Sequence, residues 1–235
     1  MVLARSRLGN GFEALEYFLD KRFLAIADIV NRFCSNQAED SVMVTLKLPL
    51  TDEEFRQIAA ANEDWCFEST KDGELVIMPP TGGNTGRRNI KISAQLESWS
   101  SGNNLGEAFD SSTLFVLPNS ARRSPDAAWI RRVSEAAPLE LRWDALTLEQ
   151  QDKYPPICPD FVIELVSPSD SVKELEQKMR EYLDNGASLG WLIDPKTRQV
   201  EVYRSGRNQE IIQSPATLSG EDVLPGFILN LQLIY

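Results

Sequence analysis

The chain has 235 residues, of which 42% are hydrophobic and 25% charged, values that predict a globular protein with a sizeable core. It contains no histidine, which excludes Ser-His-Asp and Cys-His catalysis and histidine-bound zinc. The formal net charge of −11 is unlike that of a typical nucleic-acid-binding protein, which is basic. With no apolar stretch long enough for a membrane span and no secretory signal, we expect a cytoplasmic protein without a membrane partner.

The first part of the chain differs from the rest. Apolar residues recur at helical spacing within residues 1–42, as at Phe12 and Leu15, and a polar run follows at 35–41. We therefore predict that residues 1–42 form an N-terminal helical extension and linker, and that residues 43–235 form one domain.

Local signals place the elements of the next part of the chain. Thr51 and Glu54 form a capping box, which predicts the start of a helix. A turn at Lys71-Asp72-Gly73 separates two short apolar runs, which predicts a strand pair. The expected elements are a helix at 51–61, strands at 65–68 and 74–78, and a helix at 85–100.

The second half alternates strands and helices. Ser171 and Glu174 form another capping box, and Asn185-Gly186 provides a helix end. The expected elements are strands at 107–117, 124–130, 161–166, 189–193 and 200–203, a helical insert at 139–153, a helix at 171–184 and a final strand within 224–235. The order predicts an α/β (α+β) fold with a mixed β-sheet flanked by helices.

A glutamate occupies the centre of the most apolar strand. Glu164 lies within residues 161–166, where a lone ionised carboxylate would cost roughly several kcal/mol without compensation. Asp126 lies after Ser-Pro within a second apolar strand, at 124–130. Two acids on neighbouring strands predict a site for Mg²⁺ or Mn²⁺, which prefer oxygen ligands, and at least one raised carboxyl pKa.

Lys178 is the expected cation beside Glu164. A short turn joins the strand to the following helix, and both residues lie roughly 10 Å from that turn. Tyr182 lies one helical turn beyond Lys178 on the same face. The alternatives are a buried ion pair of Glu164 with Lys178 or an arginine, and a surface ion pair of Lys178 with Glu174 or Glu181.

Several motifs together resemble a known family. The segments are Ser124-Pro125-Asp126, the run 161–170, Lys178 to Tyr182 and Gly190 to Pro195. They look like the Uma-two family of restriction endonucleases, within the PD-(D/E)xK nuclease superfamily, over about residues 43–235. The resemblance implies a restriction-endonuclease-like core, a hydrolase that cuts DNA with Mg²⁺ (or Mn²⁺), and a homodimer.

The resemblance also implies roles for individual residues. Asp126 and Glu164 match the two acids of the motif, as catalytic residues and metal ligands. The motif's lysine position holds Val166, which implies that Lys178 on the helix has taken its place. Glu68 matches an upstream acid and is expected as a further metal ligand.

Arginines near these motifs are candidates for nucleic-acid binding. Arg87 and Arg88 follow the Thr-Gly-Gly loop, and Arg122 and Arg123 precede Asp126. They predict a basic rim that contacts phosphates, with an ordinary solvated face as the alternative.

The sequence therefore predicts a metal-dependent DNA endonuclease. In such an enzyme two carboxylates hold the cation while a lysine stabilises charge on the phosphate. One alternative is a catalytically degenerate nuclease-fold binding module, which Val166 and the acidic charge favour. Another is a hydrolase of a smaller phosphoester.

Overall fold

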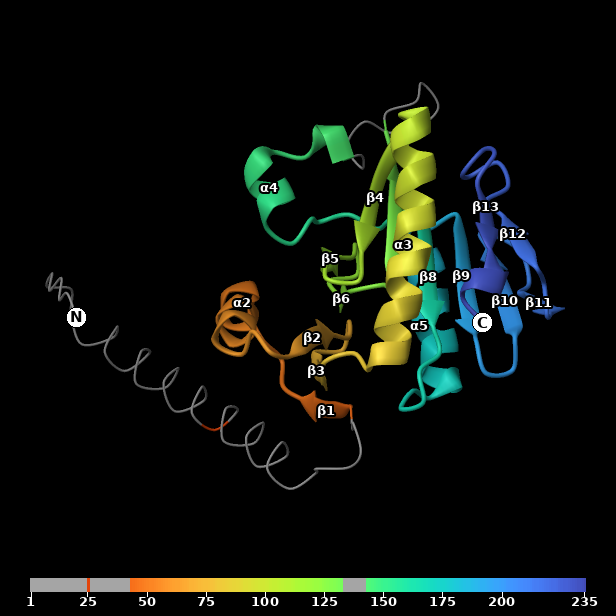
Figure 1. Cartoon of the computed structure of the whole chain (residues 1–235). Coiled ribbons are helices and arrows are strands. Elements are labelled where there is room, and N and C mark those ends of the chain that lie inside the picture. The colour runs from red at the N-terminus through yellow and green to blue at the C-terminus, as the bar shows by residue number, and fades with distance from the viewer. Residues whose placement is uncertain (1–24, 26–42, 133–142) are drawn as a thin grey trace, which may run out of the picture.

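The computed structural model describes residues 43–132 and 143–235, together with residue 25 (Figure 1). The predicted extension 1–42, residue 25 apart, and the beginning of the predicted insert 139–153 lie outside the described residues. Among the helices of the described part, none is long and apolar enough to cross a membrane.

A six-stranded mixed sheet forms the centre of the domain. Its strands, in spatial order, are β11 (Glu210–Gln213), β10 (Gln199–Arg204), β9 (Leu189–Asp194), β8 (Phe161–Leu165), β7 (Ala127–Arg131) and β4 (Gly106–Asp110). The β8–β9 pair is parallel and the other pairs are antiparallel. A parallel pair needs a crossover connection, and helix α5 (Val172–Asp184) supplies it.

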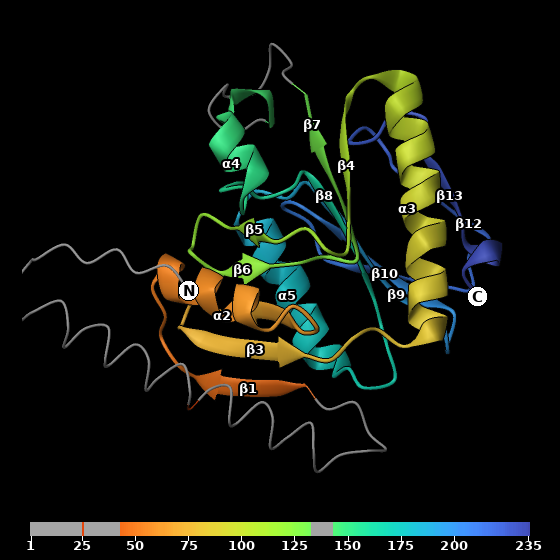
Figure 2. The same ribbon diagram turned by 60° about the vertical axis from the view of Figure 1, so that its left-hand side comes forward.

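Helices cover both faces of this sheet. Figure 2 shows α3 (Gly83–Asn103) and α5 on either side of β8 and β9. Phe161 of β8 belongs to the same core cluster as Ile92 of α3, whereas Val162 clusters with Met179 of α5. Because strand side chains alternate between faces, Glu164 lies on the α5 face.

A second sheet of five short strands lies beside α5 (Figure 2). Its strands, in spatial order, are β1 (Val44–Lys47), β3 (Glu74–Met78), β2 (Cys66–Ser69), β6 (Arg122–Arg123) and β5 (Phe115–Val116). Phe55 and Ile58 of helix α2 (Asp52–Ala61) pack into its core with Phe67 and Leu75. The capping box predicted at the start of α2 is confirmed.

Small elements complete the described chain. They are η2 (Trp143–Ala145), α4 (Leu148–Asp152), β12 (Thr217–Ser219), β13 (Ile228–Asn230) and η3 (Leu231–Leu233). Phe227 and Leu229 join the core cluster of Ile92, so the C-terminal segment covers the α3 side of the sheet.

The predicted mixed fold is confirmed, but two local predictions are wrong. The strand expected at 107–117 is split between the two sheets, because Ser112 donates from N and Oγ to Asp110 Oδ1 and turns the chain. Ser171 begins α5 without a side-chain cap, since Glu174 N bonds to the Ser171 carbonyl instead of its hydroxyl.

Deleting residues 1–42 is expected to leave a folded domain whose melting temperature changes by no more than a few degrees. The first described strand, β1, begins at Val44, and both sheets and their cores form within the described residues. Circular-dichroism melts of the full and shortened chains measure the change. A large loss of melting temperature would show that the extension packs on the domain.

Candidate active site

The predicted site residues converge where the two sheets meet α5. Glu68 lies on β2, Asp126 immediately precedes β7, Glu164 lies in β8, and Lys178 lies in α5. Side-chain hydrogen bonds and ion pairs join these elements beside α5.

Asp126 and Glu164 lie across from each other on neighbouring strands. The β7–β8 register places Ala127 opposite Ile163, so the next position of the pair sets Asp126 opposite Glu164. Directly opposite residues of an antiparallel pair share a face. Asp126 Oδ2 accepts a hydrogen bond from the Leu165 backbone N–H at 2.7 Å, which holds the aspartate at the end of β8.

Lys178 lies beside Glu164, as their equal distances from the connecting turn predicted. Its Nζ lies 2.9 Å from Glu164 Oε1 and 2.8 Å from Glu68 Oε1, and its side chain is only 11% exposed. Tyr182 donates its hydroxyl to Glu164 Oε1 at 3.0 Å. The alternative of a surface ion pair with Glu181 is wrong, because Glu181 pairs with Arg123.

A glycine allows α5 to approach the sheet closely enough for these contacts. A Cβ at Gly190 of β9 would collide with the methyl group of Met179 and lie 3.2 Å from Val162 Cγ2. Met179 is the neighbour of Lys178 on α5, so the close approach at Gly190 helps to bring the lysine to the strand.

Glu68 binds two cationic side chains, those of Lys178 and Arg123. Its Oε1 accepts from Ser124 N and from Lys178, both at 2.8 Å, and its Oε2 accepts from Arg123 at 3.1 Å. Burial would raise the pKa of Glu68, but the charges of Lys178 and Arg123 bring it below its ordinary value. Glu68 is therefore ionised and fully engaged.

The two opposed carboxyls have raised pKa values, as predicted. Burial, followed by the charges of Asp126 and Glu68, raises the pKa of Glu164 to about 8 against the opposing effect of Lys178. Burial also raises the pKa of Asp126, against the Leu165 N–H and Lys178. Burial lowers the pKa of Lys178, but Glu164 and Glu68 more than compensate, so it lies above its ordinary value. Burial contributes more to both carboxyl shifts than the mutual repulsion of carboxylates does.

The charged side chains of the site form one cluster, and its net charge favours a divalent cation. The cluster consists of four acids and two bases: Glu68, Asp126, Glu164, Glu181, Lys178 and Arg123. With all ionised, they carry two excess negative charges, which one divalent cation would neutralise. The contacts of Glu164 within the described residues all go to Oε1, which leaves Oε2 for a cation.

The acids alone do not make a complete metal site. Among the described residues, no group of three or more cysteine, aspartate or glutamate side chains is placed to hold a metal ion. Asp126 and Glu164 thus fit as two oxygen ligands of a hydrated Mg²⁺, which commonly keeps several waters. Glu68, expected as a third ligand, is occupied by Lys178 and Arg123.

Asn89 is a member of the cluster that sequence reasoning missed. It lies on α3, is 7% exposed, and donates from Nδ2 to Asp126 Oδ1 at 2.7 Å. Its Oδ1 is the one buried side-chain oxygen or nitrogen of the described residues without a hydrogen-bond partner, a defect worth about 1–3 kcal/mol. The sequence does contain a sign of this role. Asn89 lies at helical spacing from Ile92 and Leu96, which makes it a polar residue in the buried stripe of α3.

The prediction of an exposed rim is wrong for Arg122 and Arg123. Arg122 is 8% exposed, pairs with Asp52, and lies over the Phe55 ring at 4.7 Å from its centroid. Arg123 is held between Glu68 and Glu181. Both guanidinium groups satisfy acids of the same chain and are not available to phosphates.

The other two predicted arginines lie near the start of α3. Arg88 is half-buried and donates from Nε to the Ile234 carbonyl at 2.9 Å. Arg87 is exposed, and no described acid pairs with it. Of the four, Arg87 is the one that remains suited to contact a phosphate.

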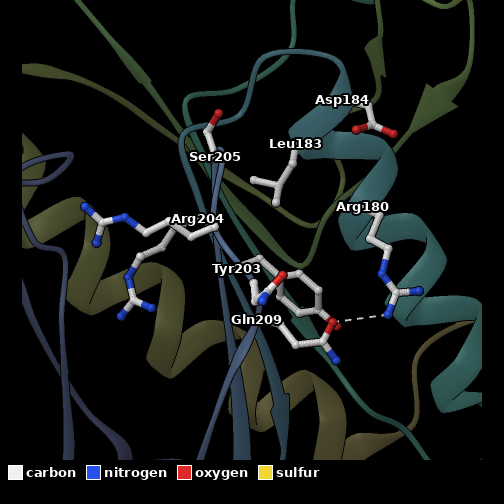
Figure 3. Close-up of a pocket in the computed structure, with 10 residues that line it drawn as sticks. Arg180, Leu183, Asp184, Tyr203, Arg204, Ser205 and Gln209 are labelled. Carbon is white, nitrogen blue, oxygen red and sulfur yellow. Dashed lines mark hydrogen bonds between the residues drawn. The ribbon is translucent and has the colours of Figure 1, made fainter.

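A surface cleft of about 800 Å³ lies elsewhere, between the end of α5 and the β10–β11 turn (Figure 3). Arg180 and Arg204 line it together with Tyr203 and Gln209. Figure 3 shows Arg180 bonded to Gln209, at 3.2 Å. Arg180 and Arg204 also pair with glutamates, and none of the cluster residues lines the cleft.

Comparisons with known proteins identify the family and the fold of the chain. The model of the Uma2 family, described as "putative restriction endonuclease", matches residues 52–232. A solved structure from Anabaena variabilis, described as a "putative nuclease belonging to DUF820", is 20% identical, with a TM-score of 0.62. The match covers 79% of this chain and 97% of that one, which establishes a shared fold. No curated protein matches the chain.

Proposed function

Because the chain belongs to the Uma2 family of restriction-endonuclease-like proteins, we propose that it is an endonuclease that hydrolyses DNA phosphodiester bonds with Mg²⁺ or Mn²⁺. The observation that carries the proposal is the opposed pair Asp126 and Glu164 with the Lys178 ammonium on Glu164. A homodimer and a cytoplasmic location remain predictions.

In this proposal Asp126 and Glu164 hold the divalent cation. When bound, such a cation polarises the phosphodiester and acidifies water. The Leu165 N–H fixes Asp126, and the Tyr182 hydroxyl orients Glu164, so neither carboxylate has to be ordered by the substrate.

Lys178 acts as a fixed positive charge. Its pKa is raised by Glu164 and Glu68 against the effect of burial, so the amine keeps its proton at neutral pH and is not a general base. A protonated lysine beside the scissile phosphate would stabilise the charge that develops in the transition state. Glu68 helps to position this ammonium through its own ion pair with Lys178, at 2.8 Å.

The placement of Lys178 supports an active site over a degenerate one. Val166, at the lysine position of the motif, packs with the apolar cluster of Met179 and Tyr182. The helix therefore brings an ammonium to Glu164 from the next element of the chain, and the charge is retained although its position in the sequence has changed.

The test is cleavage of plasmid, single-stranded and branched DNA with Mg²⁺ or Mn²⁺. Asp126→Asn should lower the rate at least a hundredfold. Glu201→Gln is a matched control, because Glu201 is a buried glutamate that accepts from Tyr203 and, like Glu164, lies beside Leu192. If neither cation supports cleavage by the unaltered chain, the binding-module alternative replaces the proposal.

The metal-free protein is expected to lose stability as the pH rises from about 4.5 to about 8. The Glu164 carboxyl releases its proton near the ordinary pKa of 4.5 when unfolded, but near 8 when buried. The folded state then binds more protons in this interval, so the free energy of unfolding falls as pH rises. Mg²⁺ requires the ionised carboxylate, so its affinity should increase over the same interval.

Thermal melts between pH 5 and 8.5, with EDTA and with Mg²⁺, measure both trends. Glu164→Gln should remove most of the pH dependence, since its amide does not titrate. A metal-free stability that rises across this interval would contradict the assignment.

Arg87→Glu is expected to weaken DNA binding and to flatten its dependence on salt. Arg87 is exposed near the start of α3, the helix that carries Asn89 to Asp126. Arg207→Glu, an exposed arginine of the Figure 3 cleft, is the matched control with the same change of charge. Filter-binding titrations at several salt concentrations compare them, and equal losses would remove Arg87 from the interface.

A further inference from the structure

The unpaired oxygen of Asn89 has a fixed orientation. Asn89 Nδ2 donates to Asp126 Oδ1 at 2.7 Å. Turning the amide over would bring its oxygen against the carboxylate oxygen of Asp126, and two acceptors would face each other. The carbonyl therefore points away from Asp126 Oδ1 and stays without a donor among the described residues.

This oxygen lies within reach of a cation bound by Asp126. The oxygen and nitrogen of one amide are roughly 2.3 Å apart, given the C=O and C–N bond lengths. With the 2.7 Å hydrogen bond, Asn89 Oδ1 is at most about 5 Å from Asp126 Oδ1. Hard divalent cations bind carboxylate and amide oxygens alike, at roughly 2.1 Å for Mg²⁺.

Asp126 and Glu164 do not complete the coordination of a divalent cation, so a further oxygen donor is needed. Asp126 and Glu164 offer two oxygens, and Glu68 is saturated by Lys178, Arg123 and a backbone N–H. No third acid among the described residues completes a metal-binding group with them. A neutral donor would add an oxygen without adding to the excess negative charge.

We propose that Asn89 Oδ1 is the third oxygen donor of the divalent-cation site, beside Asp126 and Glu164. The inference rests on the proposed function and names a ligand that carries no charge. Its donor side orders Asp126, and its acceptor side contacts the cation. One buried amide thus joins α3 to the strand pair that carries the two acids.

Two substitutions separate a ligand from a residue that only positions Asp126. Asn89→Asp keeps an oxygen in place and loses the N–H donor, whereas Asn89→Leu loses both at similar volume. Calorimetric titration with Mn²⁺ in the absence of DNA measures the dissociation constant for each. A ligand predicts Mn²⁺ binding at least as tight in Asn89→Asp as in the unaltered chain, and at least tenfold weaker in Asn89→Leu.

The opposite order would overturn the proposal. If only the hydrogen bond to Asp126 matters, Asn89→Asp weakens Mn²⁺ binding as much as Asn89→Leu does. Asn89→Asp decides the matter by itself if the leucine variant does not fold. Gln95→Met, a change of another amide on α3 that contacts Lys91 and Asn230, should leave Mn²⁺ affinity unchanged.

Failure of the inference and failure of the proposed function look different. If the unaltered chain binds Mn²⁺, Asp126→Asn weakens binding and Asn89→Leu does not, then only the role of Asn89 is wrong. If the unaltered chain binds no Mn²⁺ at any pH up to 8.5, both the proposed cation site and the proposed role of Asn89 are wrong.

Discussion

Lys178→Met is expected to destabilise the metal-free protein by about 3–5 kcal/mol at neutral pH. The ammonium lies 2.8 Å from Glu68 and 2.9 Å from Glu164, and both carboxylates are buried. Methionine is of similar length but removes the charge that these acids share. The cluster would then carry one more uncompensated negative charge in a site from which water is largely excluded.

Denaturant unfolding at pH 5 and pH 8 measures this loss. Without Lys178 the buried carboxyls keep their protons to a higher pH, so the loss should be smaller at pH 5 than at pH 8. Arg180→Met is the matched control on the same helix, because Arg180 is 51% exposed and its partners among the described residues are Glu176 and Gln209. We expect the control to change stability by about 1 kcal/mol or less. Equal losses in the two variants would show that Lys178 contributes no more than a surface charge.

Glu164→Gln is expected to abolish cleavage and Mg²⁺-induced stabilisation while keeping or raising metal-free stability. Glutamine retains an oxygen for the Tyr182 hydroxyl and removes one of the four negative charges. The Lys178 ammonium is not left unpaired, because Glu68 still lies 2.8 Å away. In the unaltered chain, Mg²⁺ at a hundredfold excess over its Kd should add about 2.7 kcal/mol to the free energy of unfolding.

Melts with Mg²⁺ and with EDTA distinguish a metal site from a purely structural ion pair. A purely structural ion pair predicts a much lower melting temperature for Glu164→Gln. It also predicts that Mg²⁺ and Mn²⁺ do not change the melting temperature of the unaltered chain. In that case the nuclease proposal should be dropped. Glu201→Gln again serves as control, since its buried carboxylate accepts from Tyr203 away from Asp126 and Lys178.

The sequence by itself determined the features that depend on neighbours along the chain. The apolar run around Glu164 and the short connection to α5 were sufficient to place Lys178 beside it, because strand and helix rises fix how far each residue lies from the turn. The capping box at Thr51 and the strand at 74–78 follow from the same local rules.

The tertiary structure alone decided which distant groups share one site. Glu68 meets Lys178 across 110 residues, and Asn89 meets Asp126 across 37. Arg122 and Arg123 look like a basic rim in sequence, yet they point at acids, because β6 is an inner strand of the five-stranded sheet. Local periodicity says which side of an element is buried, but the partner on the other side comes from the packing of the two sheets around α5.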